Sequence, residues 1–103
     1  MGGLEMNIPS EFKVGGKTYS VNQTENIYLG CDYTGECCPQ DLEINIRPLK
    51  NESVKEIVFL HEMIHAIYFH LGYTDHDEHK VEELANALHM VIMDNPGVFN
   101  SKD

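Results

Sequence analysis

The sequence predicts an α+β domain, in which a small, mainly antiparallel β-sheet packs against two helices. The first half of the chain holds short runs typical of strands, whereas the second half repeats apolar residues at helical spacing. We expect one domain over residues 1–103, β-rich over 10–48 and helical over 53–94. Because a chain of this length buries only a thin core, a bound metal ion would also stabilise the fold.

The first strand predictions rest on local patterns. Two short runs within residues 12–21 are divided by Gly15 and Gly16, and a double glycine between such runs predicts a hairpin. Residues 26–33 predict a further strand, and residues 34–35 predict the turn that follows it.

The clearest strand pattern lies in residues 42–47, where apolar and polar side chains alternate until Pro48 ends the run. This segment comes directly before the first predicted helix. We therefore expect it to form the edge of the sheet, where an extended peptide could pair with it by strand addition.

Two helices are predicted in the second half of the chain. Ser53 and Glu56 fit a capping box, and apolar residues then recur at helical spacing until Gly72. After a polar connection, the second helix covers roughly residues 78–93, and the Asn-Pro-Gly run at 95–97 ends it.

The charge of the chain is strongly acidic. Seventeen Asp and Glu oppose seven Lys and Arg, which gives a formal net charge of −10. Such a chain repels phosphate backbones, so nucleic acid is not an expected partner. We expect a polypeptide substrate or a regulatory protein as the partner, and a monomeric state.

Other global features predict a cytoplasmic protein that does not enter a membrane. No apolar run is long enough to span a bilayer, and the N-terminal residues lack the pattern of a signal peptide. The odd number of cysteines, Cys31, Cys37 and Cys38, argues against a secreted disulfide framework. We interpret all three as small, partly buried residues of the β region.

The chemistry of the chain is indicated by His61, Glu62 and His65. Two histidines four residues apart on a helix project from one face and can bind a single Zn²⁺. Glu62 lies about 100° round the helix from His61, where it can act as a general base on a water bound to that ion.

A catalytic zinc site also needs a third protein ligand. The best candidate is Glu82 on the second helix, with Asn86 one turn later on the same face. Asn86 would then support a ligand from the second coordination shell.

This pattern resembles the gluzincin branch of the zincin-like metalloproteases, in the style of the ImmA/IrrE-like and small phage-encoded peptidase domains of bacteria. The resemblance rests on Leu60-His61-Glu62-Met63-Ile64-His65-Ala66 followed by Glu82-Glu83-Leu84-Ala85-Asn86. It implies a zinc-dependent peptidase with His61, His65 and Glu82 as metal ligands, Glu62 as the general base and Asn86 in support.

A weaker resemblance, to SprT-like proteases, rests on the same HEMIHA segment. It implies a downstream histidine as the third ligand, and His79 is the candidate here. The connection residues Asp75, His76 and Asp77 are further alternatives, although they are more simply interpreted as a solvated loop. We expect His70 and His89 to be surface or packing residues.

The sequence therefore predicts zinc-dependent hydrolysis of peptide bonds. The alternative is a catalytically inactive, zincin-like binding module that holds a partner protein and keeps only a structural or vestigial metal.

Overall fold

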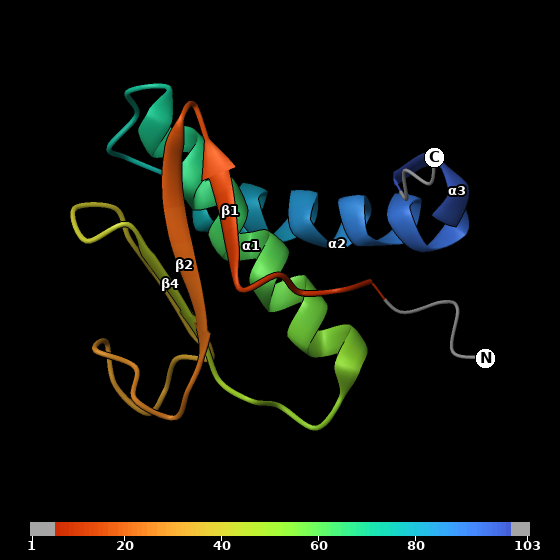
Figure 1. Ribbon diagram of the computed structural model, residues 1–103, viewed down its shortest axis with the longest axis horizontal. Coiled ribbons are helices and arrows are strands. Elements are labelled where there is room, and N and C mark those ends of the chain that lie inside the picture. Colours follow the sequence, from red (N-terminus) through yellow and green to blue (C-terminus); the bar gives the residue numbers. More distant parts are fainter. Residues whose placement is uncertain (1–5, 100–103) are drawn as a thin grey trace.

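The computed structural model describes residues 6–99, so the ends of the predicted 1–103 domain lie outside the described residues. The fold is α+β, as predicted: a four-stranded mixed sheet lies on one side of helix α1 (Glu52–His70). Helix α2 (Glu78–Asp94) crosses the other side of α1, and the short helix α3 (Pro96–Phe99) follows it (Figure 1). The long helix α1 is thus the middle layer, covered by the sheet on one face and by α2 on another.

The predicted hairpin at the N-terminal end is confirmed. Strands β1 (Glu11–Val14) and β2 (Lys17–Gln23) pair antiparallel, and the turn residues Gly15 and Gly16 have φ angles of 57° and 86°. The positive φ angle at Gly15 favours glycine, and a Cβ atom there would also require the exposed imidazole of His70, 2.0 Å away, to move aside.

The strand order in the sheet is β1-β2-β4-β3, which places β4 (Glu43–Ile46) in the interior. It pairs parallel with β2 and antiparallel with β3 (Gly35–Cys38). The expectation that residues 42–47 form the sheet edge is therefore wrong, because this strand is paired on both sides. The edge strand that lies against α1 is β3.

The expected strand at residues 26–33 is also wrong, because this segment forms a loop. Two side chains hold it through its backbone, one from β3 and one from the residue that follows β4. Glu36 accepts hydrogen bonds from the amides of Tyr28 and Leu29, both at 3.0 Å. The guanidinium of Arg47 donates to backbone carbonyls of the loop, those of Glu25, Gly30 and Tyr33. The expected turn at 34–35 is replaced by the start of β3 at Gly35.

Helix α1 begins earlier than its predicted capping box. Asn51 is the N-cap, and its side chain accepts from the amide of Val54 at 3.0 Å, so Ser53 lies inside the first turn. Glu56 does not reach back to cap the helix, because its carboxylate is buried and bonded to His89 instead. The predicted stop is confirmed, since Gly72 follows the helix with φ 95°.

Helix α2 spans nearly the predicted range. Asp77 caps it, because its side chain accepts from the amides of His79 and Lys80. Val81 and Ala85 are fully buried and join the core that packs around α1. The packing of this face determines which residues of α2 lie opposite the histidines of α1.

Within residues 6–99, no helix is both long and apolar enough to cross a bilayer.

Candidate metal centre

The two histidines of the HEMIH segment lie one turn apart on α1 and face the start of α2. His65 is 8% exposed, and the two imidazole centroids are 5.0 Å apart. The Nε2 atoms of His61 and His65 approach each other to 3.3 Å. The helix thus brings two strong nitrogen ligands to one point, as their spacing predicts.

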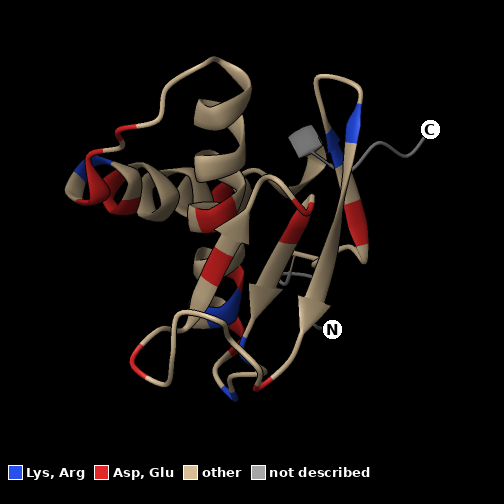
Figure 2. Ribbon diagram, turned by 90° about the vertical axis from the view of Figure 1, so that its left-hand side faces the viewer, with Lys and Arg blue, Asp and Glu red and all other residues tan. Residues whose placement is uncertain are grey.

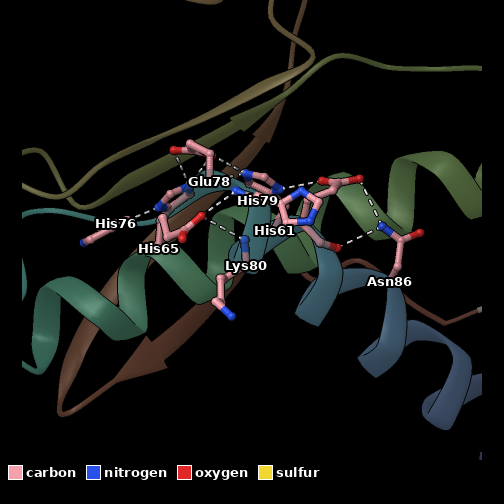
Figure 3. Close-up of polar contacts among 9 residues, drawn as sticks. His61, His65, His76, Glu78, His79, Lys80 and Asn86 are labelled. Atoms are coloured by element: carbon pink, nitrogen blue, oxygen red, sulfur yellow. Dashed lines mark hydrogen bonds and ion pairs between the residues drawn. The ribbon is translucent and has the colours of Figure 1, made fainter.

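A carboxylate that the sequence analysis did not select completes this group. Glu78 Oε1 lies 3.1 Å from His61 Nε2, and Glu78 Oε2 lies 3.1 Å from His65 Nε2. Ligand atoms of the three side chains all lie within 4.8 Å of one another, as a metal site requires (Figure 3). Glu78 is the first residue of α2 and lies one turn before Glu82, so both carboxylates share a face of the helix.

The predicted third ligand, Glu82, contacts only one of the two histidines. Its Oε1 lies 2.8 Å from His61 Nδ1, the ring nitrogen that points away from the shared Nε2 position. Asn86 donates to Glu82 Oε2 at 3.0 Å, so it supports that carboxylate rather than a histidine. The ligand role of Glu82 stays a prediction, and Glu78 is a second candidate for the same position.

The other predicted alternative, His79, lies outside the group. Its side chain is 81% exposed and pairs with Glu83 one turn later on α2. No cysteine of the described residues joins the group either. Cys37 lines the adjacent cleft, but burial raises the pKa of its thiol to about 12, and the neighbouring Glu62 and Cys38 add to the rise. A thiol with such a pKa stays protonated at neutral pH in the metal-free protein.

The polar contacts of His61 and His65 favour one neutral tautomer of each ring. Both ring nitrogens of His61 face carboxylates, Nδ1 that of Glu82 at 2.8 Å and Nε2 that of Glu78 at 3.1 Å, and a carboxylate can only accept. The shorter contact favours the proton on Nδ1 in the neutral ring, which is the tautomer that binds a metal ion through Nε2. His65 Nδ1 faces His76 Nδ1 at 2.6 Å, and His76 Nε2 donates to the carbonyl of Tyr73. When both rings are neutral, the proton between the two Nδ1 atoms therefore belongs to His65, and its Nε2, which faces Glu78, carries none.

In these neutral tautomers the two Nε2 atoms and the carboxylate of Glu78 face one another as acceptors. Such an arrangement is stable only with a proton, a water molecule or a metal ion among the lone pairs. Burial lowers the pKa of His65, with Glu78 opposing the shift, so protonation of that ring is a costly way to stabilise the arrangement. The donor set of two imidazoles and one carboxylate fits Zn²⁺.

Glu62 lies on a different face of α1 and is directed toward β3. It is 7% exposed, and a Cβ atom at Gly35 would lie 3.3 Å from its Oε2 and 2.7 Å from Val58, so β3 approaches the helix closely only because residue 35 is glycine. Burial raises the pKa of Glu62 to about 7, and Glu78 is among the carboxylates that add to the rise, whereas His61 opposes it. A carboxylate with this pKa is matched to proton transfer near neutral pH.

Two adjoining hollows form a cleft past these groups. One is about 550 Å³ and the other about 460 Å³, and both are lined by His61, Glu62 and Glu78 together with Gly35 of the edge strand. Acidic positions gather at the start of α2 (Figure 2), and Glu78 and Glu82 of this segment line the cleft. Within the described residues, no Lys or Arg lines either hollow.

The chain was compared with protein-family models, with curated proteins and with solved structures. None of the three gives a match. The resemblance to gluzincins and that to SprT-like proteases therefore stay predictions, and the argument for a function rests on the geometry of the cleft.

Proposed function

We propose that this chain is a zinc metallopeptidase, with His61 and His65 as metal ligands and either Glu78 or Glu82 as the third. The observation that carries the proposal is the convergence of the Nε2 atoms of His61 and His65 with the carboxylate of Glu78, beside a buried glutamate in an open cleft. Zn²⁺ held there supplies a Lewis acid and lowers the pKa of a coordinated water to about 7.

Glu62 is the general base and acid of this proposal. Its carboxylate lines the same cleft as the ligands but does not belong to the ligand group, so it is free to exchange protons. It takes a proton from the attacking water and returns it to the amine that leaves the scissile bond. A pKa near 7 serves both steps, because the group can hold and release a proton at neutral pH.

The substrate of the proposed reaction is an extended polypeptide. Strand β3 is paired only with β4 among the described strands, and Gly35, Glu36 and Cys37 of this strand line the cleft. A peptide that adds to this edge as a further strand would pass between β3 and the histidines of α1. This role moves from residues 42–47, as the sequence predicted, to residues 35–38. A cytoplasmic location is part of the same proposal, and the free thiols of the three cysteines support it.

The decisive experiment compares zinc content and peptide hydrolysis in matched variants. We expect about one zinc per chain in the wild type and almost none in His61→Ala. Glu62→Gln should keep its zinc and lose hydrolysis of an unfolded protein substrate by at least about 100-fold, the usual effect of removing a general base. Glu83→Gln makes the same chemical change at an exposed site outside the cleft and should leave both quantities unchanged.

Two outcomes would reject the proposal. Undiminished hydrolysis in Glu62→Gln would show that Glu62 is not the general base. A wild type that binds zinc but cleaves no unfolded substrate would instead favour the alternative of an inactive binding module.

A further inference from the structure

His76, in the connection between α1 and α2, packs against α1 although the residues around it are exposed. Of residues 71–77, all of which the structure describes, only His76 is partly buried, while its neighbours are exposed. Its ring stacks on that of His65 with centroids 4.9 Å apart and an interplanar angle of 18°. Phe69 and Tyr68 also pack against it, with ring centroids 4.4 Å and 5.2 Å from that of His76. Aromatic packing on this scale fixes the plane of the ring.

Two hydrogen bonds fix the polar edges of the same ring. His76 Nε2 lies 2.9 Å from the backbone carbonyl of Tyr73, and a carbonyl can only accept, so this nitrogen carries the proton. The neutral ring then has a bare Nδ1, which lies 2.6 Å from His65 Nδ1. His76 therefore acts as an acceptor toward His65 (Figure 3).

The carbonyl of Tyr73 is itself held by the way α1 ends. The amide of Tyr73 donates to the carbonyl of Tyr68 at 3.0 Å, across Gly72 in its left-handed conformation. This is the Schellman arrangement, and the edge-to-face contact of Tyr68 with Tyr73 accompanies it. The end of the helix thus supplies a fixed acceptor, and the orientation of His76 follows from it.

We propose that His76 is a positioning residue, which holds His65 in the tautomer and ring orientation that present its Nε2 to a metal ion. The inference rests on the metal site of the proposed function but not on peptide hydrolysis. His76 is not itself a ligand, because it contacts Nδ1 of His65, whereas His61 and Glu78 gather at Nε2. A histidine ligand in proteins usually donates its second ring N–H to a partner of this kind, and the partner sets its basicity.

The first measurement needs neither a metal nor a variant. Long-range proton–nitrogen NMR spectra of the imidazoles report which nitrogen of each ring is protonated. In chelator-treated wild type, we expect His65 to carry its proton on Nδ1 and His76 on Nε2. Protonation of His65 at Nε2 in a neutral ring would overturn the proposal.

The second measurement is the affinity for Zn²⁺, obtained by competition with a chelator in three variants. His76→Phe keeps the aromatic packing but removes the acceptor, and we expect it to bind zinc about 10- to 100-fold more weakly. His76→Asn returns an oxygen acceptor near the Nδ1 position and should recover most of the affinity. His79→Phe is the matched control, because His79 is exposed and outside the metal group.

Equal zinc affinity in wild type and His76→Phe would overturn the proposal, as would a failure of His76→Asn to exceed His76→Phe. Failure of the proposed function gives a different result. If the wild type cleaves no peptide but both measurements agree with expectation, the positioning role stands and only the enzyme assignment falls. If the wild type binds no zinc, the NMR spectra of wild type and His76→Phe still decide whether His76 sets the tautomer.

Discussion

The interface between α1 and α2 contains two groups of histidine and carboxylate, and they differ in how completely they satisfy each other. Toward the start of α1, Glu56 accepts from His89 Nε2 at 2.6 Å, and the two side chains are only 1% and 8% exposed. Farther along the same helix, His61 and His65 meet Glu78 beside an open cleft. One group is a closed pair, and the other lines a space that a ligand can enter.

The difference shows which feature of a buried polar group indicates chemistry. Burial alone does not, because the Glu56–His89 pair is the more buried of the two and serves only to join the helices. The informative feature is a set of lone pairs that face one another and line a space that a ligand can enter. Under the proposed function, Zn²⁺ is the partner of this set.

The largest expected effect tests the closed pair. His89→Ala leaves the buried carboxylate of Glu56 without its partner and should lower the free energy of unfolding by about 3–5 kcal/mol. Urea denaturation with and without a chelator measures this loss, which should be the same in both. His79→Ala is the control, because it removes an exposed histidine of the same helix. A loss below about 1 kcal/mol, the level of an exposed pair, would contradict the comparison.

The next prediction concerns Glu62, beside the open group, in the metal-free protein. Here the substitution should raise the free energy of unfolding instead of lowering it. The pKa of Glu62 is 4.5 in its ordinary state and about 7 in the fold, mainly because of burial. Between these values the unfolded chain releases its proton first, so folding stability falls as the pH rises through this window. The amide introduced by Glu62→Gln cannot ionise, and the variant should exceed the wild type by at most about 3 kcal/mol above pH 7.

Below pH 4.5 the two proteins should be equally stable, because Glu62 is then protonated in both states. The measurement is urea denaturation of chelator-treated protein across this pH range. Glu83→Gln serves as the control. Because the carboxylate of Glu83 is exposed, this variant and the wild type should have the same dependence of stability on pH. Parallel pH profiles for wild type and Glu62→Gln would show that the carboxylate is not buried from solvent.

The smallest effect sharpens the ligand assignment within the open group. Glu78→Gln and Glu82→Gln are compared by zinc competition. Substitution of a carboxylate that only supports a histidine should lower the zinc affinity about 10- to 100-fold, and substitution of the ligand itself should lower it more. The contacts of Glu78 with both Nε2 atoms lead us to expect the larger loss in Glu78→Gln. A larger loss in Glu82→Gln would assign the ligand to Glu82, as the sequence resemblance implies.

The sequence was a good guide wherever a structure depends on near neighbours. The double glycine predicted the hairpin, and the four-residue spacing of His61 and His65 predicted that both would face one point. It was a poor guide for residues 26–33, because their β-like composition is overridden by Glu36 and Arg47, which bind the backbone of this segment. The contacts of Glu36 reach back seven and eight residues and that of Arg47 with Gly30 reaches back 17, which is beyond the two-residue period of a strand pattern.

The same limit explains what was missed at the site. Glu78 could have been noticed as the residue one turn before Glu82, but a first-turn glutamate is equally typical of any helix start. The position of His76 depends on how α1 ends and on its contacts with three aromatic rings. The sequence around residue 76 therefore could not predict its contact with His65.

The sequence by itself determined that one helix carries two imidazoles and a glutamate at a spacing fit for metal chemistry, because helical periodicity fixes the directions of side chains a few residues apart. Only the tertiary structure decided which strand forms the edge beside that helix, which carboxylate meets both imidazoles, and which neighbour holds the second histidine. These outcomes depend on the crossing of α2 over α1 and on the strand order of the sheet, and both are set by packing between segments that are distant in the chain.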